Sequence, residues 1–207
     1  DLAWYAWWLG VHIMLGSAAR VVWGSGNRTG VVATLEWSAI GDPLTITADN
    51  FACELATLST SDVAFFAGGP NELRTYAFDG TTWSQTGSSL NIGETSFMSM
   101  TGLNSTDVAI VQGTNNNLQT YRFNGSTWSA VGSAFDLGSV SDPSIAALNS
   151  TDVALLDATI DELRTYRFNG STWSQIGNGL SYPNGASRMT ALNSTDVAIL
   201  DGNLRTY

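Results

Sequence analysis

Short apolar segments alternate with polar turns along most of the chain. Between residues 144 and 177, SIAAL and VALLD are separated by Asn-Ser-Thr-Asp, and LRTYRF and STWSQIG are separated by Asn-Gly. Short polar side chains bond their own backbone and reverse the chain, and Asn-Gly is a strong signal for a two-residue hairpin turn with positive φ at both positions. The pattern predicts four antiparallel strands, at 144–148, 153–157, 163–168 and 171–177.

The four-strand pattern recurs with a fixed period. The Asp of a Ser/Thr-Asp-Val-Ala motif repeats at intervals of 45, 45 and 44 residues, and the Trp of a Trp-Ser-x-x-Gly motif at intervals of 46, 45 and 45. These units contain no apolar stripe at helical spacing. Four strands per unit of this length are typical of a β-propeller blade, whose two faces are covered by neighbouring blades. We expect an all-β propeller of four-stranded blades, with about 45 residues per blade.

One unit resembles a known type of blade. Residues 62 to 87 read DVAFFAGGPNELRTYAFDGTTWSQTG. The apolar second strand, the Gly68-Gly69 pair, the third-strand Tyr and the fourth-strand Trp after a tight turn are similar to a kelch-type blade. The other units read VQG, LDA and LDG in place of Gly-Gly, so the resemblance is to the architecture. It implies a propeller of the kelch-like kind.

The two ends of the repeated region complement each other. TLEWSAIG, at 34–41, reads as a fourth strand without a complete blade before it, and residues 186–207 lack a fourth strand. Propellers are often closed by a strand from each terminus, which removes free sheet edges. We therefore expect four blades, the last one closed by the N-terminal strand. The alternative is one part of a larger ring, built from several copies or from a longer array.

The first thirty residues do not repeat. Thirteen of the fourteen residues from Leu2 to Leu15 are apolar or Gly. The run is short for a membrane span and starts with Asp where a secretion signal has basic residues. Packing on or between propellers, membrane contact through residues 1–22 and an irregular leader stay open. We expect two parts, an apolar Trp-rich segment at 1–30 and the propeller at 31–207. The candidate assembly segment comprises Trp4, Trp7, Trp8, Leu9 and Ile13.

Charge and rare residues limit the chemistry. Eight Lys and Arg against eighteen Asp and Glu give a net charge of −10, which opposes binding to nucleic acid. Cys53 is the single cysteine and His12 the single histidine, so a Ser-His-Asp relay or a multi-histidine metal site on the propeller is excluded. We expect no enzyme activity and no cofactor. The abundance of Ser, Thr, Asn and Gly favours an extracellular or cell-surface location.

A repeated pair on the third strand is the candidate for ligand contact. Arg and Tyr two positions apart can recognise a sugar or a carboxylate through bidentate hydrogen bonds and stacking. Alternatively, these long side chains fill the space between sheets. The positions are Arg74, Tyr76, Gln119, Tyr121, Arg164, Tyr166, Arg205 and Tyr207.

The units diverge where the second strand meets the third, reading AGGPNE, QGTNNN, DATIDE and DGN. Binding sites are commonly carried by variable loops on a rigid scaffold. We therefore predict a non-enzymatic binding or adhesion module, whose rim loops contact a protein or glycan partner. The alternatives are a lectin with one sugar site per blade and a structural subunit that self-associates through its apolar N-terminal segment.

Overall fold

The computed structural model describes residues 20–22, 34–36, 39–46, 53–93, 98–158, 160–182, 188–200 and 202–207. Contacts divide the chain into two units, Asp1–Asp42 and Pro43–Tyr207. In the first unit, β1 (Arg20–Val22) pairs with β2 (Thr34–Glu36) in an antiparallel ladder. The predicted boundary at residue 30 lies outside the described residues, as does the candidate assembly segment: Trp4, Trp7, Trp8, Leu9 and Ile13.

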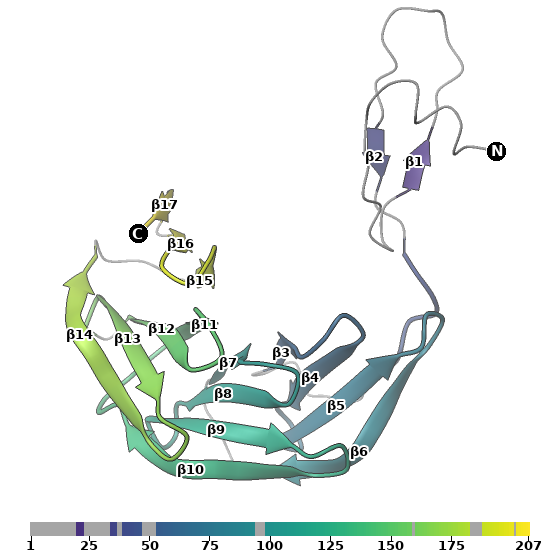
Figure 1. Ribbon diagram of the computed structural model, residues 1–207, viewed down its shortest axis with the longest axis horizontal. Helices are drawn as coiled ribbons and strands as arrows, with labels where there is room; N and C mark the ends of the chain where they lie inside the picture. The colour runs from purple at the N-terminus through teal and green to yellow at the C-terminus, as the bar shows by residue number, and fades with distance from the viewer. Residues whose placement is uncertain are drawn as a thin grey trace, which may run out of the picture. The chain divides into compact units, whose positions relative to one another are not determined.

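The second unit consists of four blades (Figure 1). Blade 1 contains β3 (Glu54–Thr57), β4 (Asp62–Ala67), β5 (Glu72–Phe78) and β6 (Trp83–Asn91). Blade 2 contains β7 (Met98–Gly102), β8 (Asp107–Gln112), β9 (Asn117–Phe123) and β10 (Trp128–Asp136). Blade 3 contains β11 (Ser144–Ala147), β12 (Asp152–Asp157), β13 (Glu162–Phe168) and β14 (Trp173–Ser181). Blade 4 contains β15 (Arg188–Ala191), β16 (Val197–Leu200) and β17 (Leu204–Thr206).

Each blade is an antiparallel meander in which every strand pairs with the next one along the chain. The first strands of successive blades lie side by side, in the order β3, β7, β11 and β15, and the blades fan out from them (Figure 1). Hydroxyl groups join these inner strands, because Ser99 Oγ accepts from the Ile145 N–H at 3.1 Å and Ser144 Oγ from the Met189 N–H at 2.9 Å. The predicted all-β propeller with four blades is confirmed.

The structure differs from the sequence-based prediction at the closing strand. Blade 4 has three strands in the part of the chain that is described, and Thr34–Glu36 pairs with Arg20–Val22. Closing a short loop costs less conformational entropy than joining segments more than a hundred residues apart. A local hairpin partner therefore supplies the backbone hydrogen bonds of β2.

The Asn-Gly turns also differ from the predicted two-residue form. Strand β13 ends at Phe168 and β14 begins at Trp173, which leaves a four-residue turn. Asn169 Oδ1 accepts hydrogen bonds from the backbone N–H groups of Ser171 and Thr172, both at 2.9 Å. Gly170 has a φ of 94°, whereas Asn169 does not have positive φ. The Asn side chain, rather than a left-handed Asn backbone, stabilises the reversal.

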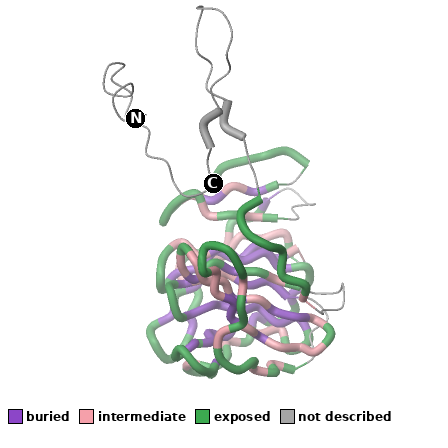
Figure 2. The backbone as a smooth tube through the Cα atoms, turned by 90° about the vertical axis from the view of Figure 1, so that its right-hand side faces the viewer, coloured by how far each residue is buried: buried purple, intermediate pink, exposed green. Residues whose placement is uncertain are grey.

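Buried apolar side chains fill the space between neighbouring blades. Figure 2 marks the buried residues in purple along the strands of the blades. Ala64 and Phe66 of blade 1 share one cluster with Val108 and Ile110 of blade 2. Trp128 begins the fourth strand of blade 2 and belongs to the same cluster. The repeated Trp therefore contributes to the core between blades, and its period follows the stacking of the blades.

Among the described residues, no helix is long and apolar enough to cross a membrane.

Candidate functional site

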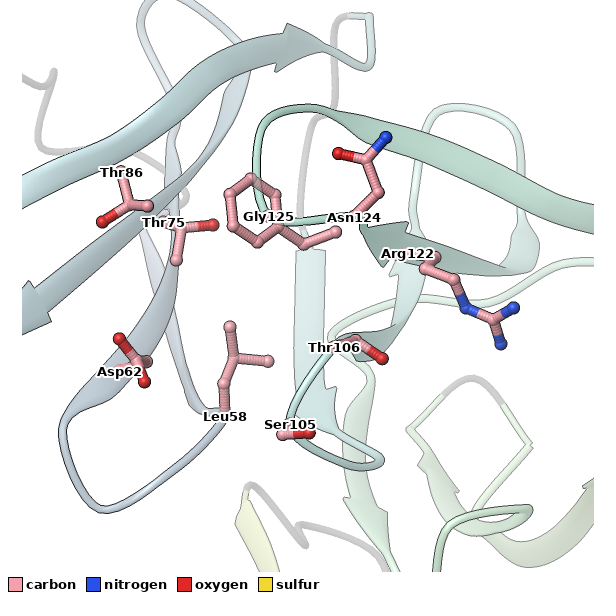
Figure 3. Close-up of a pocket in the computed structure, with 10 residues that line it drawn as sticks. Leu58, Asp62, Thr75, Thr86, Ser105, Thr106, Arg122, Asn124 and Gly125 are labelled. Carbon is pink, nitrogen blue, oxygen red and sulfur yellow. The ribbon is translucent and has the colours of Figure 1, made fainter.

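A pocket of about 510 Å³ lies between blade 1 and blade 2 (Figure 3). Its volume falls within the range of sites for small molecules. Figure 3 shows Asp62 and Thr75 on the side of blade 1, facing Thr106 and Asn124 of blade 2. The lining residues are Leu58, Asp62, Thr75, Thr86, Ser105, Thr106, Arg122, Phe123, Asn124 and Gly125.

The turns of the two blades place this pocket at one rim of the propeller. In an antiparallel meander, the turn between strands one and two lies at the same end as the turn between strands three and four. Ser105 and Thr106 belong to the first of these turns in blade 2, and Asn124 and Gly125 to the second. The variable loops join strands two and three, so they lie at the opposite rim and are not part of the pocket.

Buried polar atoms at this junction lack partners that the next junction provides. Between blades 2 and 3, Trp173 Nε1 donates to Thr120 Oγ1 at 3.0 Å. The corresponding residues between blades 1 and 2 are Trp128 and Thr75, which are only 4% and 3% exposed. Neither Trp128 Nε1 nor Thr75 Oγ1 has a hydrogen-bond partner. Because an unsatisfied buried polar group costs about 1–3 kcal/mol, Thr75, which lines the pocket, favours a ligand that supplies a hydrogen bond.

The carboxylate in the pocket also differs from its counterparts in the following blades. Asp107 faces Arg122 across β8 and β9, and the guanidinium binds it through two hydrogen bonds of 2.7 Å. Asp62 instead faces Ala77 across β4 and β5. The hydroxyl groups of Ser59 and Ser61 donate to its carboxylate. The Asp62 carboxylate is therefore held by serine hydroxyl groups, with no arginine on the opposite strand.

The arginine partners lower the pKa values of the aspartates in these turns. Hydrogen bonds from Arg167 lower the pKa of Asp152 to about 2, and Arg122 lowers the pKa of Asp107 in the same way. Sequence reasoning interpreted these aspartates only as turn formers. A signal was present, since both blades have an Arg fifteen residues after the Asp whereas blade 1 has Ala77.

The predicted third-strand contacts lie between the sheets or at their edge. Arg74 binds Glu72 at 2.8 Å and Arg164 binds Glu162 at 2.9 Å, while Gln119 Nε2 donates to the backbone carbonyls of Thr120 and Val131. The tyrosines of the first three blades are buried: Tyr76, Tyr121 and Tyr166. In blade 4, Arg205 is exposed and Tyr207 packs against the core of the last two blades. Their role in ligand contact stays a prediction.

Comparisons with known proteins concern the fold of the chain. No protein-family model and no curated protein matches the chain. The β-propeller domain of Cps50 (Swd1) from Myceliophteria thermophila is similar with a TM-score of 0.50 at 9% identity, over 74% of this chain and 52% of that one. A protein from Bacteroides uniformis provisionally assigned as a 6-phosphogluconolactonase has a TM-score of 0.56 at 10% identity, over 79% and 57%.

A lectin from Aleuria aurantia, solved with alpha-methyl-L-fucoside, has a TM-score of 0.47 at 18% identity, over 71% of this chain and 53% of that one. The chain thus spans a little over half the length of each of these structures. At such low identity the comparisons show a β-propeller fold. A fold alone does not determine function, so the choice of function depends on the site.

Proposed function

We propose that this β-propeller is a non-enzymatic binding module, whose pocket between blades 1 and 2 takes one sugar unit of a glycan. The observation that carries the proposal is the unpartnered buried hydroxyl of Thr75, which lines the pocket. A sugar hydroxyl both accepts and donates hydrogen bonds. One sugar hydroxyl that bonds Thr75 Oγ1 would satisfy this atom.

The remaining walls of the pocket suit the same ligand. The Asp62 carboxylate accepts hydrogen bonds from further hydroxyl groups, and the ring of Phe123 offers an apolar surface to the C–H face of a sugar. The net charge of −10 disfavours an anionic ligand. A neutral polyhydroxylated ligand therefore fits the charges as well as the volume.

One site per chain is favoured over one site per blade. At the junction of blades 2 and 3, Thr120 and Trp173 already bond each other. In blade 2, Thr120 pairs with Val131 on the neighbouring strand, whereas in blade 1 the corresponding Thr75 pairs with Thr86. The second junction is therefore less polar and has both polar atoms satisfied.

The test is titration of the full chain with a panel of methyl glycosides. Binding is measured by tryptophan fluorescence and by calorimetry. We expect binding with a stoichiometry near one, lost in Thr75→Val and retained in the matched variant Thr120→Val. Absence of binding across the panel, or equal loss in both variants, would refute the sugar site. A stoichiometry of three or more would favour the lectin with a site in each blade.

Several finer predictions stay open beside this proposal. Composition supports an extracellular or cell-surface location, and the Gly68-Gly69 unit supports a kelch-like subfamily. A protein partner at the variable rim loops is the second candidate, supported by the divergence of these loops among the units. The structural-subunit alternative rests on the apolar segment at residues 1–30.

A further inference from the structure

Asp62, Thr75 and Ala77 share the face of blade 1 that is packed against blade 2. Side chains two residues apart on a strand lie on the same face of a sheet. Ala64 belongs to the core cluster shared with blade 2, so Asp62 on the same strand faces blade 2 as well. Ala77 pairs with Asp62, and Thr75, two residues before it on β5, lines the pocket together with Asp62. Position 77 is therefore directed to the same side as the pocket.

Blades 2 and 3 hold an arginine at the position of Ala77. Arg122 pairs across the strands with Asp107. Arg167 pairs with Asp152 in the same way. Each guanidinium donates two hydrogen bonds of 2.7 Å to its carboxylate, one to each oxygen. Blade 1 therefore has the carboxylate but not the cation that binds it in the next two blades.

The Asp62 carboxylate has one oxygen available to a ligand. The hydroxyl groups of Ser59 and Ser61 both bond Oδ2. Among the described residues, no hydrogen-bond donor reaches Oδ1. In Asp107, by contrast, Oδ1 accepts a hydrogen bond from Arg122 Nε. A carboxylate oxygen only accepts hydrogen bonds, and its bonds to cationic donors are stronger than those to neutral donors.

The charges around the pocket favour a cationic group at Asp62. Asp62 and Arg122 are the acid and the base among the lining residues. The guanidinium of Arg122 is already bound by Asp107, and Figure 3 shows it extending away from Asp62. The chain as a whole has a net charge of −10, which attracts cations. The Asp62 carboxylate is therefore the group in this pocket to which a ligand cation would bind.

We propose that the sugar unit in this pocket carries a free amino group, whose ammonium pairs with Asp62 as the guanidinium of Arg122 pairs with Asp107. This inference rests on the proposed sugar site. A neutral sugar offers Asp62 only a hydroxyl group, which forms a weaker hydrogen bond than an ammonium does. Ala77 then determines specificity, because an arginine at this position would bond Asp62 itself and exclude the amino group.

Calorimetry of the full chain with matched methyl glycosides tests the amino group. Each sugar is compared at pH 6 in three forms: the amine, its N-acetyl derivative and the parent with a hydroxyl group at the same carbon. We expect the amine to bind about tenfold more tightly than the parent, because a charge-assisted hydrogen bond replaces a neutral one. The N-acetyl form keeps the nitrogen without the charge, so it should show no such gain.

Two substitutions locate the gain in affinity at Asp62. Asp62→Asn should bind the amine no more tightly than the parent sugar, whereas Asp152→Asn, the matched change in blade 3, should keep the preference for the amine. Ala77→Arg should lose binding of every glycoside, because its guanidinium takes the place of the ligand. Circular dichroism of each variant should match the wild type, which separates loss of binding from loss of fold.

The outcomes separate the amino group from the sugar site itself. If neutral glycosides bind through Thr75 but their amines bind no more tightly, or if the preference survives in Asp62→Asn, the amino group is refuted and the sugar site stands. Absence of binding by every glycoside would overturn both. Binding of N-acetylarginine amide alone would then identify the cation as an arginine side chain of a protein partner.

Discussion

At the residue scale, two threonines at the same place in successive blades have different surroundings. Thr120 accepts a hydrogen bond from the Trp173 indole, while Thr75 and Trp128 are buried without one. Both pairs have the same residue types at the same spacing. The same residue pair is therefore satisfied at one junction and leaves unpartnered polar atoms at the other.

We predict that valine substitutions separate these two roles without any ligand present. Thr120→Val should lower the free energy of unfolding by about 1–3 kcal/mol, because it leaves the buried Trp173 indole unpaired. Thr75→Val should leave stability unchanged or raise it, because the hydroxyl that it removes has no partner. Urea unfolding measures both. Equal losses would contradict the difference between the two junctions.

The pair of Asp152 and Arg167 makes stability depend on pH. The pKa of Asp152 is depressed from its ordinary 3.8 to about 2 in the folded protein. The stabilisation is therefore present above the unfolded value and is lost as the pH falls from 3.8 towards 2. Arg167→Ala should lower stability at neutral pH and flatten its decline on acidification.

Thermal unfolding between pH 6 and pH 2 provides the measurement. Arg188→Ala is the control, because it removes the same charge from an ion pair whose two side chains are mostly exposed. It should retain the wild-type decline in stability below pH 3.8, where Asp152 titrates, because Arg188 acts instead on Glu54, whose pKa is raised above 4.5. An acid dependence unaffected by Arg167→Ala would show that the guanidinium does not hold the carboxylate.

At the element scale, the fourth strand of each blade is tied to the next blade by backbone contacts. The N–H of Ser133 in β10 donates to the carbonyl of Ser171 at 2.8 Å, and that of Ser88 in β6 donates to the carbonyl of Ser126 at 2.8 Å. The accepting residues lie in the turn between strands three and four of the following blade. The repeated turn thus serves both its own hairpin and the preceding blade.

A pair of glycine substitutions should measure this contact between blades. Gly132 and Gly177 occupy the same position in successive blades, and each has a φ of 70°. Alanine at either position pays for a left-handed backbone, about 1–2 kcal/mol. A Cβ at Gly132 would also lie 2.6 Å from the carbonyl carbon of Ser171, whereas nothing lies within 4 Å at Gly177.

Gly132→Ala should therefore destabilise the protein more than Gly177→Ala, as measured by urea unfolding. The difference between the two variants reports the contact with Ser171, because the backbone strain is common to both. Equal destabilisation would mean that the turn of blade 3 moves away from β10 without cost.

At the scale of the whole molecule, the blades form a series with two unlike ends. Each internal junction buries a face of one blade against a face of the next, whereas Leu55 of blade 1 and Leu204 of blade 4 are 63% and 77% exposed.

The sequence by itself determined the repeat, the all-β class, the four-strand blade and the positions of the turns. These follow from local rules, because alternation of apolar residues and turn chemistry act within a few residues. The buried Trp128 and Trp173 were also predictable, since both recur with the period of the blades.

Only the tertiary structure decided the pairing of β2 with β1, the satisfied and unsatisfied Thr-Trp pairs and the exposure of Leu55 and Leu204. The two Thr-Trp pairs have the same residues at the same spacing and still differ in hydrogen bonding. The reason is physical, because burial and hydrogen bonding depend on which sheet faces which, and that is set by contacts between segments some 45 residues apart.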